Sequence, residues 1–169
     1  MIRHLLISST FILTSTAIFV PTANADEPAV IASGIVATSC NFIKLNDGEL
    51  AVNSTSNPTS LSSSESGGTP AKVKIDCDGD AKLTISEPKQ TTTGLSGKTV
   101  FPTSNLTATA SNTALGLSVN SKSQPTGDIF ANADGDAVGI IEVNMEANNG
   151  SQNISPGDYQ FTVILTSTP

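Results

Sequence analysis

The stretch that decides the fold is residues 71–86, AKVKIDCDGDAKLTIS. Apolar and polar residues alternate through both of its halves, which is the period-two pattern of a strand with one buried face. A short polar run, Asp78-Gly79-Asp80, separates the two halves. The apolar positions are Val73, Ile75 and Cys77 before this run and Ala81, Leu83 and Ile85 after it. Two half-buried strands are therefore predicted on either side of a turn.

The pairing of these two strands has two solutions. A hairpin with the three-residue loop 78–80 sets Cys77 opposite Ala81 and keeps both apolar sets on one face. Alternatively, the two strands belong to different sheets of a sandwich, and both apolar sets still point into the core.

The same alternation recurs along the rest of the chain. It is found at 106–110, 115–119, 141–147 and 159–165, and an extended segment is expected at 29–39, ending at Cys40. Asn46-Asp47-Gly48 is a hairpin-like turn signal between two short apolar stretches. After residue 25, apolar residues do not recur at helical spacing over three turns, and Ser, Thr, Asn and Gly are abundant. The prediction is an all-β, antiparallel β-sandwich of about seven to nine strands.

The first 25 residues have the form of an export signal. Arg3 precedes an apolar run at 5–20, and Ala23-Asn24-Ala25 is a small-x-small cleavage site. The run is too short and too interrupted by Ser and Thr for a membrane span, and no later segment reaches that length. We therefore predict an exported protein that is periplasmic, at the cell surface or extracellular, with no transmembrane segment after removal of the signal.

Cleavage after Ala25 leaves 144 of the 169 residues, enough for one domain at 26–169. Within it, residues 53–70, NSTSNPTSLSSSESGGTP, have no periodicity and little to bury. They are predicted to form a flexible Ser/Thr/Gly-rich loop inside the single domain.

The charge of the chain excludes some partners. Eight Lys and Arg, one of which is Arg3 in the signal, stand against fifteen Asp and Glu, so the mature chain carries seven against fifteen, a net charge of −8. A chain this acidic and without Arg is repelled by phosphate backbones and anionic lipids. Nucleic acid is therefore not an expected partner.

Cys40 and Cys77 are the two cysteines of the chain. In an exported protein such a pair is expected to form a disulfide, in preference to a metal site or a reactive thiol. A metal site would need further soft ligands, and the only histidine, His4, lies in the signal. Closing this loop would stabilise the fold by roughly 3–4 kcal/mol in the chain-entropy model.

Several of these features together resemble a known family. An early cysteine, a low-complexity loop, a strand ending in a second cysteine (VKIDCDGDAKLTIS) and a closing SPGDYQFTVILTSTP are similar to the spore coat protein U family and to chaperone–usher pilus subunits. The resemblance implies an immunoglobulin-like sandwich that serves as a surface or fibre subunit. It also implies that Cys40 and Cys77 form the bridge and that residues 159–165 form the terminal core strand.

One departure from the family pattern concerns assembly. Pilus subunits use an N-terminal extension to complete the sheet of a neighbour, a form of β-augmentation. Here only fourteen mature residues precede Cys40, and they include the expected strand at 29–39. This favours a self-complete domain over assembly by strand exchange.

Calcium is the one candidate cofactor. Asp76, Asp78 and Asp80 alternate, and Glu87 follows at the twelfth position, as in part of an EF-hand loop. However, glycine falls at the fourth position instead of the sixth, and a strand follows where a helix should. A solvated turn is the simpler interpretation. A weaker calcium site at Asp78 and Asp80, or at Asp134 and Asp136, remains open.

Catalysis is not expected, since the mature chain has no histidine and no residue set that indicates an active site. Glu142 and Glu146 are separated by roughly 13 Å on a strand, too far for joint work on one glycosidic bond. The prediction is a structural or adhesive cell-surface protein that acts by protein–protein interaction, including self-assembly. The alternative is a Ca²⁺- or glycan-binding β-sandwich module.

Overall fold

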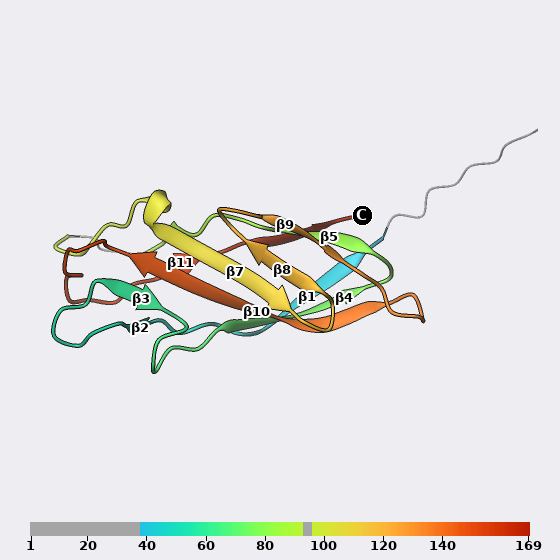
Figure 1. The fold of residues 1–169 in the computed structure, drawn as a ribbon, viewed down its shortest axis with the longest axis horizontal. Coiled ribbons are helices and arrows are strands. Elements are labelled where there is room, and N and C mark those ends of the chain that lie inside the picture. Colours follow the sequence, from blue (N-terminus) through green and yellow to red (C-terminus); the bar gives the residue numbers. More distant parts are fainter. Residues whose placement is uncertain (1–37, 93–95) are drawn as a thin grey trace, which may run out of the picture. The chain divides into compact units, whose positions relative to one another are not determined.

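The computed structural model describes residues 38–92 and 96–169 (Figure 1). The elements are β1 Cys40–Asn46, β2 Ala51–Val52, β3 Ser60–Ser62, β4 Ala71–Cys77, β5 Ala81–Ile85, β6 Lys89–Gln90, the 3₁₀ turn Thr103–Asn105, β7 Leu106–Asn112, β8 Leu117–Asn120, β9 Thr126–Ile129, β10 Ala137–Asn148, β11 Phe161–Thr162 and β12 Leu165–Thr168.

The first sheet is built around the long strand β10. Val143 of β10 pairs with Ala71 of β4 and with Ala110 of β7, so β4 and β7 lie on opposite sides of it. Further along β10, β3 takes the place of β4 on the same side. β1 and β2 lie outside β4 and β3, and β8 lies outside β7. All pairs are antiparallel, and the sheet has five strand positions.

The second sheet is narrower. β5 lies between β12 and β9, and β6 continues the line of β5 to pair with β11. Between the two ladders the Ser86 amide donates to the Ile164 carbonyl at 2.9 Å, so β11 and β12 form one interrupted strand. This sheet therefore has three strand positions, and the fold has eight among the described residues.

The alternating residues of both sheets meet in the core. Ile75 and Cys77 of β4 are buried against Leu83 and Ile85 of β5, and Ile141 of β10 joins them. The two halves of the stretch 71–86 thus belong to different sheets, and the hairpin alternative is wrong. The predicted all-β antiparallel sandwich with one disulfide, Cys40–Cys77, is confirmed.

The strand order corresponds to an immunoglobulin-like sandwich. In that fold one sheet holds strands A, B, E and D and the other holds C, F and G. Here β1/β2, β3/β4, β10 and β7 take the A, B, E and D positions, and β5/β6 and β11/β12 take C and F. Within residues 38–92 and 96–169, no strand takes the G position beside β11/β12.

Two local predictions differ from the structure. Cys40 begins a strand instead of ending one, and the expected strand at 29–39 lies outside the described residues apart from its last two positions. The turn signal at 46–48 makes no hairpin: β1 and β2 run on along one edge, and the backbone bends there. A Cβ on Gly48 would lie 2.8 Å from the Ala71 amide nitrogen, so this bend brings two backbones into contact.

The predicted loop also contains a strand. β3 lies within 53–70, where Leu61 and Ser63 are buried, so only the parts on either side of β3 are loop. β9 is a further strand that the alternation does not predict. The predicted export signal at 1–25 lies outside the described residues. In the part of the chain that the structure describes, no helix is long and apolar enough to cross a membrane.

Candidate functional site: an open sheet edge

The sandwich is closed along one side and open along the other. On the closed side the chain passes from β8 in the first sheet directly to β9 in the second, and the Asn120 amide donates to the Gln124 carbonyl at 2.8 Å within this crossing. The opposite side is bordered by β1/β2 of the first sheet and β11/β12 of the second. This pair of edges is the candidate site.

In the part of the chain that the structure describes, the backbone of β11/β12 has groups without a strand partner along this open side. Gln160 and Ile164 use their backbone groups toward β6 and β5: the Gln160 carbonyl accepts from the Thr91 amide at 2.8 Å, and the Ile164 carbonyl accepts from Ser86. Because these groups alternate in direction along a strand, those of the intervening residues point outward. The outward set is Phe161, Val163, Leu165 and Ser167.

The same residues send their side chains toward the core, where they are only half-buried. Val163 and Leu165 pack against the main core cluster but are partly exposed, whereas Leu83 and Ile85 of the neighbouring β5 are 0% and 1% exposed. Phe161 is likewise half-buried and packs edge-to-face on buried Phe101, with ring centroids 5.7 Å apart. These side chains are exposed toward the open side, because β5 covers them on the other side.

The facing edge, β1, likewise directs every second residue's backbone groups to the open side. The Ser39 carbonyl accepts from the Asp78 amide at 3.1 Å, so Ser39 directs its groups toward β4. Cys40 and Phe42 alternate with it and direct theirs to the open side, while their side chains are half-buried against the core. The disulfide joins the first residue of this edge to Cys77 in the adjacent inner strand.

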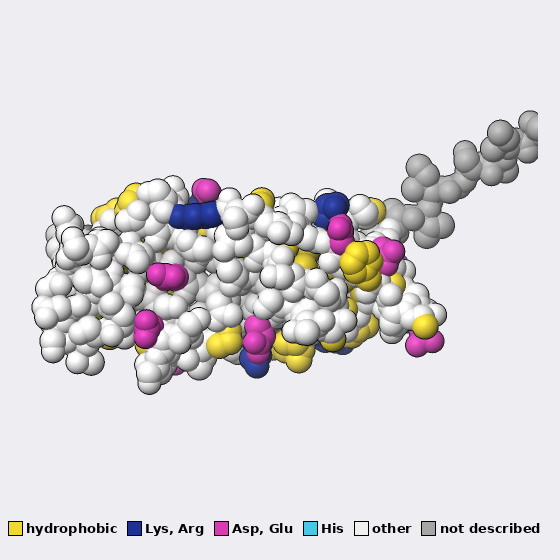
Figure 2. Space-filling view, in the orientation of Figure 1, with side chains coloured by type: hydrophobic (Ala, Val, Ile, Leu, Met, Phe, Trp, Pro, Cys, Tyr) yellow, Lys and Arg dark blue, Asp and Glu magenta, His cyan; other side chains and the backbone are white. Residues whose placement is uncertain are grey.

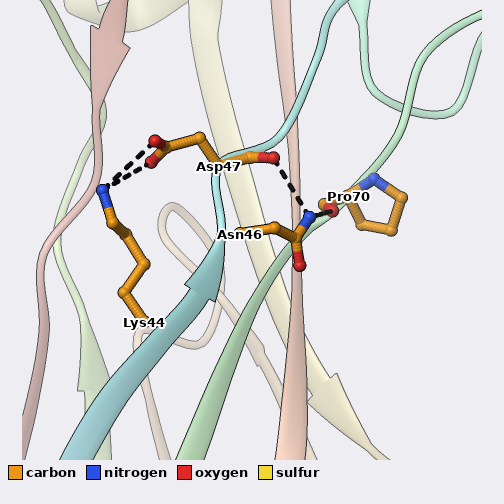
Figure 3. Close-up of polar contacts among 4 residues, drawn as sticks. All are labelled: Lys44, Asn46, Asp47 and Pro70. Atoms are coloured by element: carbon orange, nitrogen blue, oxygen red, sulfur yellow. Dashed lines mark hydrogen bonds and ion pairs between the residues drawn. The ribbon is translucent and has the colours of Figure 1, made fainter.

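Lys44 marks the limit of the apolar part of this edge. It follows Phe42 on the inward register, opposite Val73, yet its side chain is exposed and pairs with Asp47 at 3.0 Å (Figure 3). The Asn46 amide group holds the bend by donating to the carbonyls of Asp47 and Pro70 at 3.1 and 3.3 Å. A charge at an inward edge position disfavours unspecific strand pairing.

A cleft lies at the end of the sandwich where β2 and β3 meet the start of β11. Its volume is about 660 Å³, and it is lined by Val52, Ser54, Thr55, Ser56, Pro58, Leu61, Asn153, Ile154, Ser155, Pro156, Gly157 and Tyr159. Tyr159 fixes one wall, because its hydroxyl donates to the Ser155 carbonyl at 2.7 Å and accepts from the Thr99 amide at 3.0 Å. This is the arrangement of the tyrosine corner of immunoglobulin-like folds.

Two of the four aspartates considered for calcium use their carboxylates to hold loops. Asp78 accepts from the Ser39 amide at 2.5 Å and Asp80 from the Ala131 amide at 2.7 Å, so each ties a loop to its turn. The backbone amides of Asp134 and Asp136 both donate to the side chain of Asn132. Among the described residues, no group of three or more His, Cys, Asp or Glu side chains is placed to hold a metal ion. Calcium binding stays a prediction.

A polar hollow of about 330 Å³ lies on the outer face of the first sheet. It is lined by Ser104, Asn105, Thr107, Lys122, Glu146, Asn148 and Gly150. The Lys122 ammonium donates to the Ser104 carbonyl, and the Asn148 amide group lies 3.4 Å from Glu146. The hollow therefore combines hydroxyl, amide and charged groups without an aromatic side chain.

Comparisons of the chain with protein-family models, with curated proteins and with solved structures gave no match. The resemblance to spore coat protein U and pilus subunits therefore stays a prediction.

The open edge was not among the residues singled out from sequence. The last alternating segment was assigned correctly to the core, but alternation alone does not show whether a strand has one neighbour or two. One further signal is present: Phe161–Thr168, FTVILTST, contains no charged residue and no proline, although natural edge strands usually carry one or the other.

Proposed function

We propose that this protein is an exported structural subunit that acts by protein–protein association, in which the free edge of β11/β12 accepts a strand from a second copy. The observation that carries the proposal is the uncovered edge itself. Four residues direct backbone donors and acceptors outward, and three of them, Phe161, Val163 and Leu165, have half-buried apolar side chains. An added strand would form hydrogen bonds with the outward backbone groups and would cover the half-buried apolar side chains.

Residues 29–37 of a second copy are the proposed occupant, since Ser39 is already bonded to Asp78 of its own domain. This segment has no charged residue, and its nine residues would extend about 30 Å, against about 26 Å for the eight residues of the edge. The described strands begin at Cys40, so none of them uses this segment. We assign this segment to the neighbour's edge in place of the strand in its own domain that the sequence predicts.

The direction of the chain favours a second copy over the segment's own domain. Residue 38 and the C-terminal end of β12 lie at the same end of the sandwich, since Cys40 pairs with Cys77 and Thr168 pairs with Lys82 next to the 78–80 turn. A segment that reaches residue 38 along its own edge would run parallel to β12. A segment from another copy can enter antiparallel, which is the more stable pairing.

Ser167→Pro tests this proposal with little change to the core. Proline removes an outward amide that the sheet does not use, as is tolerated on edge strands. We expect the mature wild-type chain to form multimers that survive dilution and resist SDS without heating. We expect Ser167→Pro to form no such SDS-resistant multimers, with a nearly unchanged melting temperature. Ser167→Ala is the matched control, because it keeps the amide, and should assemble like the wild type.

Two results would overturn the proposal. A wild-type chain that is monomeric at every concentration would indicate a self-complete domain. A Ser167→Pro variant that assembles as well as the wild type would show that the contact lies elsewhere.

Glycan binding is a second candidate function, favoured by the polar hollow on the outer face. Sugar hydroxyls are matched by paired donors and acceptors such as Asn105, Lys122 and Glu146, which line it. Saturation-transfer NMR with a panel of oligosaccharides tests this function. A signal that is lost in Glu146→Gln supports it, and no signal from any sugar rejects it.

A further inference from the structure

Phe130 is an exposed aromatic side chain at the end of the domain where the N-terminal segment enters. It is 62% exposed, while the other aromatic residues at 38–92 and 96–169 are buried or half-buried. It follows directly on β9, whose Ile129 pairs with Ala81, and the next amide, that of Ala131, is fixed by Asp80. The backbone that carries Phe130 is therefore tied to the 78–80 turn, and the described residues leave most of its ring exposed.

The opposite end of the domain has the cleft described above. Its apolar lining, Val52, Leu61, Ile154 and Tyr159, lies beside the buried aromatic ring of Phe101, which packs edge-to-face on Tyr159 with centroids 5.8 Å apart. A volume of about 660 Å³ is ample for one benzyl group together with its flanking backbone. An aromatic ring placed there would extend an existing aromatic cluster.

The two features are too far apart to meet within one molecule. β10 begins at Ala137, on the Phe130 side, and ends at Asn148, beside β3 and the cleft. Its twelve residues span about 40 Å at the usual rise of a strand. Contact between Phe130 and the cleft therefore requires a second copy.

Charge determines which ends can meet. The Phe130 end has Asp78, Asp80, Asp128, Asp134 and Asp136 with Lys82 as the cation among them, and Figure 2 shows hydrophobic atoms beside acidic groups at the right-hand end. Two such ends would repel each other. The cleft lining has no charged side chain, and at its rim Lys98 packs along Gly157 while its ammonium donates to the Asp158 carbonyl. Lys98 and the exposed carboxylate of Asp158 are one charge of each sign, so the cleft lacks the excess of negative charge found at the Phe130 end.

We propose that Phe130 of one copy docks in the cleft of the next, giving a head-to-tail contact. A surface that fits a pocket elsewhere on the same molecule forms an open chain instead of a closed dimer. The role of this contact in assembly rests on the proposed function, to which it adds a second interface between copies. A donated segment that runs antiparallel to β12 ends at the cleft end of the acceptor. The donor domain follows directly after it, so the Phe130 end of the donor would lie beside the cleft of the acceptor.

Complementation between two variants tests the head-to-tail contact. Phe130→Ala removes the ring, and Thr55→Trp fills the cleft from an exposed position in its lining. In the full mature chain carrying Ser167→Pro, which blocks strand addition, we expect reversible association in sedimentation velocity and none for either variant alone. An equimolar mixture should form pairs and nothing longer, because one complementary end of each kind remains. Ile140→Ala, which removes an exposed side chain (47%) from the sheet face, should change nothing.

Two outcomes would overturn the contact: association of Phe130→Ala like its parent, or a mixture that stays monomeric. Photo-crosslinking gives an independent reading if Thr55→Trp fails to fold. Benzoylphenylalanine at position 130 of the otherwise unaltered chain should crosslink to peptides containing 52–61 or 153–159 of another copy, and crosslinks only elsewhere would reject the contact. SDS-resistant multimers that persist in Phe130→Ala support strand addition, whereas reversible pairs without such multimers would reject strand addition and leave this contact standing.

Discussion

At the scale of single residues, two buried serines complete the hydrogen bonding of the first sheet. The Ser63 hydroxyl accepts from the Met145 amide at 3.0 Å, where β3 ends and β4 has not begun. The Ser121 hydroxyl accepts from the Ala108 amide at 3.0 Å, just beyond the end of β8. Each hydroxyl replaces a strand carbonyl, so the buried amides of β10 and β7 keep a partner.

Ser121→Ala should lower the free energy of unfolding by about 1–3 kcal/mol, because the Ala108 amide would be buried without an acceptor. Urea denaturation of the purified domain measures this loss. Ser118→Ala is the control, since Ser118 is exposed on the same strand and should change stability by less than about 0.5 kcal/mol. Equal effects of the two substitutions would contradict this role of the Ser121 hydroxyl.

Replacing both cysteines should destabilise the domain by roughly 3–4 kcal/mol, the value expected for closing a loop of this length. The Cys40→Ala, Cys77→Ala double variant avoids a free thiol, and its denaturation curve can be compared directly with that of the oxidised wild type. Reduction of the wild type under native conditions should give a similar loss. An unchanged midpoint would show that β1 is held by its hydrogen bonds alone.

At the scale of elements, β3 shows where composition is a poor guide. Residues 53–70 are rich in Ser, Thr and Gly, yet Leu61 is buried with Ala147 and Met145, and the Ser63 amide donates to the Met145 carbonyl at 3.0 Å. One leucine with alternating serines makes a strand here because β10 is already in place to pair with it. Tertiary context outweighs the weak intrinsic preference of such residues.

Hydrogen exchange should therefore divide this segment. The amide of Ser63 should exchange slowly, with protection close to that of β10, while the amides of exposed Ser56 and Ser66 should exchange rapidly. Mass-spectrometric or NMR exchange on the folded protein measures both. Uniformly fast exchange across 53–70 would instead support a fully flexible loop.

The sequence predicts the strands better than their partners. The alternation in β4, β5, β7, β8 and β10 identifies the buried face of each correctly, because burial of one face enforces a period of two. The short strands β2, β3 and β6 have only two or three residues, too few for a period to be recognised. Their existence depends on neighbours distant in the chain.

The candidate site was harder to predict for a related reason. Phe161, Val163 and Leu165 have the pattern of core residues, and the same alternation is seen in one sequence whether such residues are half-buried or fully buried. What makes them a site is the position of β12 at the end of the second sheet, which follows from the pairing of all other strands. Of the aspartates that drew attention in the sequence, Asp78 and Asp80 hold loop ends with their carboxylates, and calcium binding stays a prediction.

At the scale of the whole molecule, the net charge opposes assembly. With a mature charge of −8, copies that approach each other repel, and salt weakens this repulsion. Raising the ionic strength from about 0.01 M to about 0.15 M shortens the screening length from ~30 Å to ~8 Å. Multimer formation, followed by light scattering, should therefore become faster with salt. A slower rate at high salt would contradict this expectation, because it would indicate association driven by attraction between opposite charges.

The position of the disulfide has a mechanical consequence for any filament built from this subunit. Tension along such a filament would enter each domain through the segment before Cys40, at the first residue of an outer strand. Without a covalent link, pulling there would peel β1 from the sheet one hydrogen bond at a time. With Cys40 bonded to Cys77, the force passes at once to β4, which is flanked by β1 and β10 and can yield only by shearing many hydrogen bonds together. The bridge makes the weakest edge of the domain resistant to tension.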